Sequence, residues 1–310
     1  MDLSTRLGRD PLLTQGTSGN TSLKLGDTLW IKAAGQCLAD AGLDIFLPVD
    51  LAAVRACVKR RIDPAERAVV TANWLRPSIE TAMHAVLPHA VVLHVHSVNT
   101  IAWAIRQDAP LLLKSLLHGI DWRWIPYVPS GLDLALEIEK NASAEVLILA
   151  NHGLVVCGED CEAAESLLQE VERRLSITPR HHPDPDWNLL SRIADGSPWI
   201  LPVNPALHAL GTDPVSRRIL SGGFLFPCQS TAVKSSRPRL FRPVQCQGLA
   251  NRCKGRFGGR PFLIVESAGM LVKEILTPAG LSMLNGLVEV LQRASPTAPI
   301  QYLPEMDFRH

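Results

Sequence analysis

The sequence predicts a layered α/β fold followed by a second, smaller α/β unit, and three observations support this. First, the 310 residues are 46% hydrophobic and 20% charged, which is typical of a folded chain longer than a single average domain. Second, short apolar strand patterns alternate with helical patterns as far as residue 175. Third, the composition becomes rich in proline and aspartate at 176–188. We therefore divide the chain into residues 1–178, a linker at 179–190 and a small α/β domain of unknown role at 191–310.

Charge and composition exclude several classes of protein. The 31 Lys and Arg residues are balanced by 30 Asp and Glu residues, so no overall positive field favours nucleic acid or a membrane surface. No apolar run reaches the roughly 18 residues of a spanning helix. The first residues lack the apolar core of a signal peptide. The seven cysteines are odd in number and contain no CxxC pair, which indicates reduced cysteines in a cytoplasmic protein.

The first segment with chemical interest is Gln15–Ser22, a loop rich in glycine, serine and threonine. Glycines let backbone amides approach an anion, and Asn20 can donate a hydrogen bond to an oxyanion. A loop of this composition is more often structural, so it predicts no binding site by itself. It leads into a predicted hairpin of residues 21–24 and 28–33 that turns at Gly26.

Glu80 is the second candidate. Pro77 suits the first turn of a helix, which places Glu80 near the positive end of the helix dipole. That position alone can account for a glutamate. The apolar residues that follow helical spacing up to Pro88 are Ile79, Met83, Val86 and Leu87.

Two histidines on one predicted strand form the third and most informative candidate. In Val91–Ser97, His94 and His96 are two residues apart, so their side chains project from the same face of the strand. Such a pair can bind one small cation if a third ligand arrives from elsewhere. His152 directly follows another apolar strand and can supply that ligand. The pattern predicts a divalent-metal site.

The remaining predicted elements complete the two units. In the first unit they are strand 46–50, helix 51–61 capped by Asp50, helices 99–106 and 110–118, strand 124–128, helix 132–140, strands 145–150 and 154–157, and helix 160–175. In the second unit they are helix 213–220, strands 240–244, 261–266 and 269–275, and a helix over 281–293 capped by Thr277. His181 and His182 fall in the proline-rich stretch, where a solvated linker is the simplest interpretation.

The motifs GTSGNTS, RPSIE, HVH, PYVPSG and NHG occur in this order within about the first 175 residues. Together they resemble the class II aldolase/adducin family, which includes fuculose-phosphate and rhamnulose-phosphate aldolases and ribulose-phosphate 4-epimerases. No single motif is specific, but the combination is. The resemblance implies an α/β/α domain with a central, mostly antiparallel sheet, and a homo-oligomer, a tetramer in relatives, with sites between subunits.

The resemblance also implies roles for individual residues. His94, His96 and His152 would hold Zn²⁺, or another divalent metal such as Mn²⁺ or Co²⁺. Glu80 would be the catalytic acid/base, and Tyr127 a proton donor across a subunit boundary. The residues implied in binding the substrate or its phosphate are Gly19, Asn20, Gly35 and Ser78, and Lys32 is a further candidate because its charge can bind an anion.

Two departures from the family pattern affect the substrate anion. Ala34 precedes Gly35 where relatives carry a hydroxyl residue, and Ile79 replaces a second serine of fuculose-phosphate aldolase. Two phosphate donors are therefore absent. Either a basic side chain (Lys24, Lys32 or Arg76) supplies the charge, or the anion is a carboxylate.

These expectations combine into a metal-dependent aldolase-type lyase of carbohydrate metabolism. It would cleave or form a C–C bond in a small hydroxy-keto sugar, sugar phosphate or sugar acid through a metal-bound enediolate. An epimerase or decarboxylase on the same site is the alternative among enzymes. A non-catalytic, adducin-like scaffold is the alternative outside them. The expected partners are the sugar substrate and further copies of the chain, with no nucleic acid and no membrane.

Overall fold

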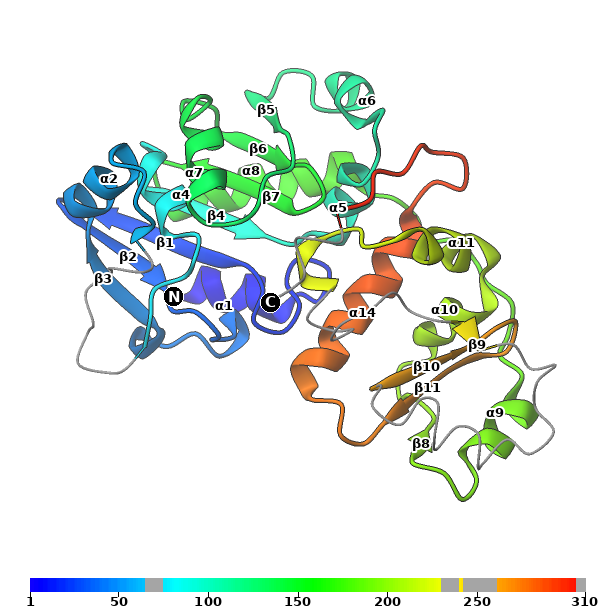
Figure 1. Cartoon of the computed structure of the whole chain (residues 1–310). Coiled ribbons are helices and arrows are strands. Elements are labelled where there is room, and N and C mark those ends of the chain that lie inside the picture. The colour runs from blue at the N-terminus through cyan, green and yellow to red at the C-terminus, as the bar shows by residue number, and fades with distance from the viewer. Residues whose placement is uncertain (65–74, 230–239, 242–260, 305–310) are drawn as a thin grey trace. The chain divides into compact units, whose positions relative to one another are not determined.

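A computed structural model describes residues 1–64, 75–229, 240–241 and 261–304 (Figure 1). The chain separates into two compact units, Met1–Ser176 and Ile177–His310. Each unit has its own sheet. Three sequence features lie outside the described residues: Cys246, Cys253 and the predicted strand positions 242–244.

The first unit is built on a seven-stranded sheet with the order β3-β2-β1-β4-β7-β6-β5. All neighbouring strands are antiparallel except β5 and β6, which run parallel. The sheet confirms the predicted mixed α/β class with a mostly antiparallel core. The strands are β1 Asn20–Leu25, β2 Thr28–Lys32, β3 Phe46–Asp50, β4 Val91–Val95, β5 Trp122–Ile125, β6 Val146–Leu149 and β7 Gly153–Gly158.

The hairpin at the start of the sheet forms where the sequence predicts it. β1 pairs with β2 up to Leu25 and Thr28, and Gly26 takes a positive φ of 57° in the turn between them. β3 then adds to β2 and ends at Asp50. The Asp50 carboxylate accepts a hydrogen bond from the Ala53 amide at 2.8 Å, so it caps helix α2 as predicted.

Helices cover both faces of this sheet (Figure 1), because strand β4 is apolar on both sides. Leu93 packs into a core with Leu168 of α8. Val92 packs into a second core with Met83 of α4 and Leu134 of α7. The helices of this unit are α1 Asp2–Arg9, α2 Leu51–Lys59, α4 Thr81–Val86, α5 Val98–Ala104, α6 Ala109–Leu116, α7 Leu132–Glu139 and α8 Cys161–Leu175, with short 3₁₀ turns at Leu38–Asp40 and Leu43–Ile45.

One helix begins later than the sequence predicts. Pro77 was expected in its first turn, but α4 starts at Thr81 and Glu80 is its N-cap residue. The reason is pairing with the end of β2: the Ala34 amide donates to the Arg76 carbonyl, and the Ser78 amide donates to the Lys32 carbonyl. These bonds hold residues 76–78 extended.

The second unit has a four-stranded sheet with the order β8-β11-β10-β9. Its strands are β8 Trp199–Ile200, β9 Leu240–Phe241, β10 Phe262–Val265 and β11 Gly269–Lys273. The helices among its described residues are α9 Trp187–Ala194, α10 Ala209–Thr212, α11 Pro214–Gly222 and α14 Pro278–Arg293, with a 3₁₀ turn at Pro205–His208. Thr277 caps α14 with its side chain, as the sequence predicts. Asp213, predicted as the first residue of a helix, is the N-cap of α11 and accepts from the amides of Val215 and Ser216.

The stretch predicted as a solvated linker is partly structured. Residues 187–190 form the start of α9, because the Asp186 carboxylate caps the helix and Leu190 is buried in the core of the second unit. The Arg180 guanidinium donates to the Asp213 carboxylate at 2.7 Å and to the Leu291 carbonyl at 2.7 Å. This segment is therefore attached to the second unit.

Among the described residues, no helix is long and apolar enough to cross a membrane. Within the described ranges, Cys37, Cys57, Cys157 and Cys161 are free thiols.

Candidate metal centre

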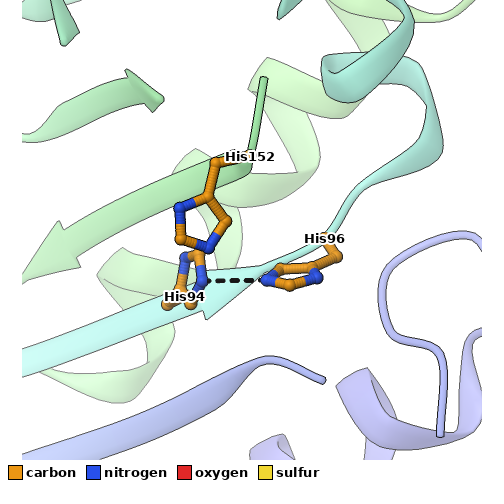
Figure 2. A group of neighbouring side chains, drawn as sticks. All are labelled: His94, His96 and His152. Atoms are coloured by element: carbon orange, nitrogen blue, oxygen red, sulfur yellow. Dashed lines mark hydrogen bonds between the residues drawn. The ribbon is translucent and has the colours of Figure 1, made fainter. Parts of the chain in front are cut away.

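Three histidines converge where strand β4 ends beside the turn between β6 and β7 (Figure 2). His94 lies on β4, His96 follows the last residue of that strand, and His152 lies in the turn. β7 pairs with β4 so that Leu154 faces Val95. This register brings the turn against the segment that carries the other two rings.

The ligand atoms of the three rings fit a single ion. One ligand nitrogen from each of His94, His96 and His152 lies within 4.8 Å of the others, and the Nε2 atoms of His94 and His96 are 3.1 Å apart. With metal–nitrogen distances of about 2.0–2.1 Å, two ligands of a tetrahedral Zn²⁺ lie about 3.3 Å apart. The rings are therefore close to the spacing that an ion requires.

The protonation of His94 and His96 also suits a metal. His94 Nδ1 lies 3.1 Å from the Leu154 carbonyl and donates to it, which leaves the Nε2 lone pair facing the other rings. Burial lowers the pKa of His94 to about 4 and holds that of His96 well below its usual value. Neutral imidazoles at neutral pH are the form that binds metal.

Two glycines allow the backbone to approach this strand. A Cβ on Gly153 would lie 2.6 Å from the Val95 carbonyl oxygen, and a Cβ on Gly19 would lie 2.9 Å from the His94 carbonyl oxygen. Gly19 also has a positive φ of 71°. Only glycine fits at either position without moving the strand that carries the histidines.

The Glu80 carboxylate faces the same cluster. Its Oε1 lies 3.2 Å from His152 Nε2, and its Oε2 lies 3.4 Å from His94 Nε2. Only 6% of Glu80 is exposed. Burial opposes ionisation of Glu80, but the surrounding imidazoles outweigh it and hold the pKa of the carboxyl well below its usual value.

The structure places two of the predicted substrate-binding residues against Glu80. The Asn20 amide nitrogen donates to Glu80 Oε2 at 2.7 Å and to Ser78 Oγ at 3.3 Å. Ser78 Oγ also accepts from the Glu80 backbone amide at 3.2 Å. Because the Ser78 oxygen already accepts from these two donors, its hydroxyl proton points away from both of them.

The other predicted residues lie in the surrounding loops. Lys32 is 2% exposed, and its ammonium donates to the carbonyls of Thr17 at 3.0 Å and Gln36 at 2.6 Å. Burial lowers the pKa of Lys32 to about 8. Gly35 has a positive φ of 74° and open space around it. Tyr127 is half-buried in the segment that follows β5.

Two further polar residues belong to this site and were not singled out from the sequence. The Ser130 hydroxyl donates to Glu80 Oε1 at 3.3 Å. His84 is fully buried, and its Nε2 bonds to Asn20 Oδ1. A signal for His84 was present, since residues four apart at the start of a helix lie on the same side. Ser130 stands in the PYVPSG motif, for which the sequence predicts a role only for Tyr127.

Comparison with known proteins agrees with the fold of the first unit. Residues 3–178 match the family model described as the class II aldolase and adducin N-terminal domain. The N-terminal class II aldolase domain of a conserved protein from Thermoplasma acidophilum has a similar fold, with a TM-score of 0.51 at 24% identity. That match covers 56% of this chain and 89% of the other.

Curated relatives carry names of different reactions. The 3-oxo-tetronate 4-phosphate decarboxylase of Escherichia coli O6:H1 is 28% identical over 52% of this chain and 76% of its own length. The methylthioribulose-1-phosphate dehydratase of Enterobacter sp. 638 is 30% identical over 50% and 80%. The L-fuculose phosphate aldolase of Methanocaldococcus jannaschii is 26% identical over 53% and 84%. An uncharacterized oxidoreductase of Bacillus subtilis, YuxG, is 29% identical over 58% of this chain, but the match spans only 29% of that longer protein.

Proposed function

The chain belongs to the class II aldolase and adducin family through residues 3–178, and on that premise we propose that it is a metal-dependent lyase. It would cleave or form a C–C bond in a small hydroxy-keto sugar, sugar phosphate or sugar acid. The observation that carries the proposal is the convergence of three buried imidazoles and one carboxylate, Glu80, on one point. The substrates in the names of the three relatives above all carry a phosphate, which supports a phosphorylated sugar.

His94, His96 and His152 would hold the ion, and Zn²⁺ suits a set of neutral nitrogen ligands. When bound, the ion supplies a Lewis acid that stabilises negative charge developing on substrate oxygens. The protein's own contribution is to keep His94 and His96 neutral and to hold all three rings in a site that is largely shielded from water.

Glu80 would move the proton at the reacting carbon. Its carboxylate lies beside the imidazoles, and its pKa well below the usual value means that it is ionised at neutral pH, the form in which a carboxylate can accept a proton. Ser78 would donate its hydroxyl proton to the anionic end of the substrate, because its oxygen already accepts two hydrogen bonds.

Decarboxylation is the second candidate, supported by the relative named for that reaction. Dehydration is supported in the same way by the methylthioribulose phosphate relative. Epimerisation on the same site remains a further alternative. Within the family, an adducin-like scaffold would lack turnover, although buried ligands around a carboxylate have no purpose in a scaffold.

The test is a combined metal and substrate assay on the purified chain of residues 1–310. Mild chelation should remove loosely bound metal, and we expect the protein to retain about one zinc per chain, measured by mass spectrometry. NMR of L-fuculose phosphate, 3-oxo-tetronate 4-phosphate and methylthioribulose 1-phosphate would then distinguish aldehyde release, loss of CO₂, loss of water and inversion of a centre. A protein with neither metal nor turnover would be a scaffold.

We further propose that the active form is a homo-oligomer in which Tyr127 donates a proton to the site of a neighbouring subunit. Light scattering gives the oligomeric state, and Tyr127→Phe should lower kcat while the oligomer persists. Residues 191–310 would contribute to turnover or to assembly. Removing them should therefore change turnover or assembly.

A further inference from the structure

A chain of four buried polar side chains ends on Glu80. Ser22 Oγ lies 2.7 Å from His84 Nδ1, His84 Nε2 bonds to Asn20 Oδ1, and Asn20 Nδ2 lies 2.7 Å from Glu80 Oε2. Ser22 and Asn20 are 4% exposed, and His84 is inaccessible to solvent. Such a row of buried polar groups requires every hydrogen bond to be made.

The fold brings these four residues together from two elements. Asn20 and Ser22 lie two residues apart on β1, so both side chains leave the same face of the sheet. Asn20 is paired with His94 on the neighbouring strand, which places it beside the metal centre. Glu80 and His84 are four residues apart at the start of α4 and therefore face β1 together.

The direction of each hydrogen bond follows from the orientation of the Asn20 amide. Its nitrogen faces Glu80, so its oxygen faces His84 and can only accept. His84 must therefore carry its proton on Nε2. Its Nδ1 is then an acceptor, and the Ser22 hydroxyl donates to it. Burial, together with Lys24 and His94, holds the pKa of His84 well below its usual value, which agrees with a neutral ring.

We propose that His84 is a positioning residue that acts through Asn20 to fix the Glu80 carboxylate beside the histidine cluster. This inference rests on the proposed role of Glu80 as the acid/base. The Asn20 amide is held at both ends, because its nitrogen donates to Glu80 and Ser78 while its oxygen accepts from His84. Without that bond the amide can rotate, and the carboxylate loses its shortest hydrogen bond.

Three variants of His84 separate positioning from packing. In His84→Gln the side-chain amide nitrogen reaches the place of Nε2 and can still donate to Asn20. In His84→Asn the shorter side chain reaches only the place of Nδ1, towards Ser22. His84→Leu fills the space and makes neither bond. Because Gln and Asn are both amides buried at the same position, they form a matched pair.

The kinetic readout uses the zinc-loaded protein and its best substrate. We expect His84→Leu and His84→Asn to lower kcat about 10- to 100-fold, the usual effect of losing a group that orients a catalytic residue. The KM should stay within about twofold and zinc stoichiometry should be unchanged. The kcat of His84→Gln should be at least tenfold higher than that of His84→Asn. Equal rates for the Gln and Asn variants would overturn the proposal, and this comparison stands even if His84→Leu does not fold.

A second readout requires no substrate. In the ¹⁵N-histidine spectrum of the zinc-loaded full chain, His84 should show a protonated Nε2 and an unprotonated Nδ1, with the signal assigned by its loss in His84→Gln. A protonated Nδ1 would overturn the hydrogen-bond chain. Absence of turnover in the wild-type protein would count against the proposed reaction and would leave this result intact.

Discussion

The substitution Gly153→Ala tests whether the turn that carries His152 is positioned by direct contact with strand β4. The new Cβ would lie 2.6 Å from the Val95 carbonyl oxygen, about 0.8 Å short of the 3.4 Å at which ordinary contact begins. It would also lie 3.3 Å from Cδ2 of His96 and 3.5 Å from Cε1 of His94. One methyl group would therefore push apart the two segments that provide the three imidazoles.

The magnitude follows from the size of this displacement. Overpacking of a buried site costs about 1–3 kcal/mol of unfolding free energy. A shift of several tenths of an ångström between His152 and the other two rings should weaken zinc binding by about 10- to 100-fold, as a change beside a metal ligand usually does. The bond from His94 Nδ1 to the Leu154 carbonyl should also lengthen, because Leu154 follows the substituted residue.

Gly158→Ala is the matched control at the other end of β7. Its Cβ would lie 2.7 Å from the Ala164 amide nitrogen, so it is equally crowded but faces helix α8. Thermal denaturation should show a similar loss of stability for both variants. Competition with a fluorescent zinc chelator should show weaker binding for Gly153→Ala alone. Wild-type zinc affinity in Gly153→Ala, or an equal loss in Gly158→Ala, would refute the reasoning.

Three further predictions address the site. Glu80→Gln should retain zinc and lower kcat by about 10² to 10⁴, the range for a lost acid/base; near-normal turnover in a substrate assay would assign that role to another residue. His94→Ala should lose zinc and turnover together, as measured by metal analysis and kinetics. The control His118→Ala changes an exposed histidine and should alter neither. Zinc retained by His94→Ala would contradict the ligand set. The pKa of His94 is about 4 in the folded protein against an ordinary 6.5, so the unfolded chain binds more protons between these values. The free energy of unfolding of the metal-free protein should therefore decrease as the pH falls from about 6.5 to 4. His94 alone should account for a decrease of about 2 kcal/mol between pH 7 and pH 5. Urea midpoints that do not fall over this range would count against a buried neutral ring.

The sequence by itself determined the fold class and the candidate ligands. Short, nearly continuous apolar runs predicted the central strands of the first sheet, because a strand that is buried on both faces is apolar along most of its length. His94 and His96 were assigned to one side of one strand by their spacing alone. The turn at Gly26 and the cap at Asp50 are local interactions, so short sequence signals were sufficient for both.

The tertiary structure decided what these residues contact. No local signal indicates that residues 76–78 pair with the end of β2, and this long-range pairing moves the start of α4 to Thr81. The sequence around Lys32 indicates no partner for its ammonium group. The carbonyls of Thr17 and Gln36 reach it only because the loops fold around it. The hydrogen-bond chain that ends on Glu80 likewise joins β1 to α4, some 60 residues apart in sequence. Local sequence determines which groups a segment can offer, but packing between distant segments determines which of those groups meet.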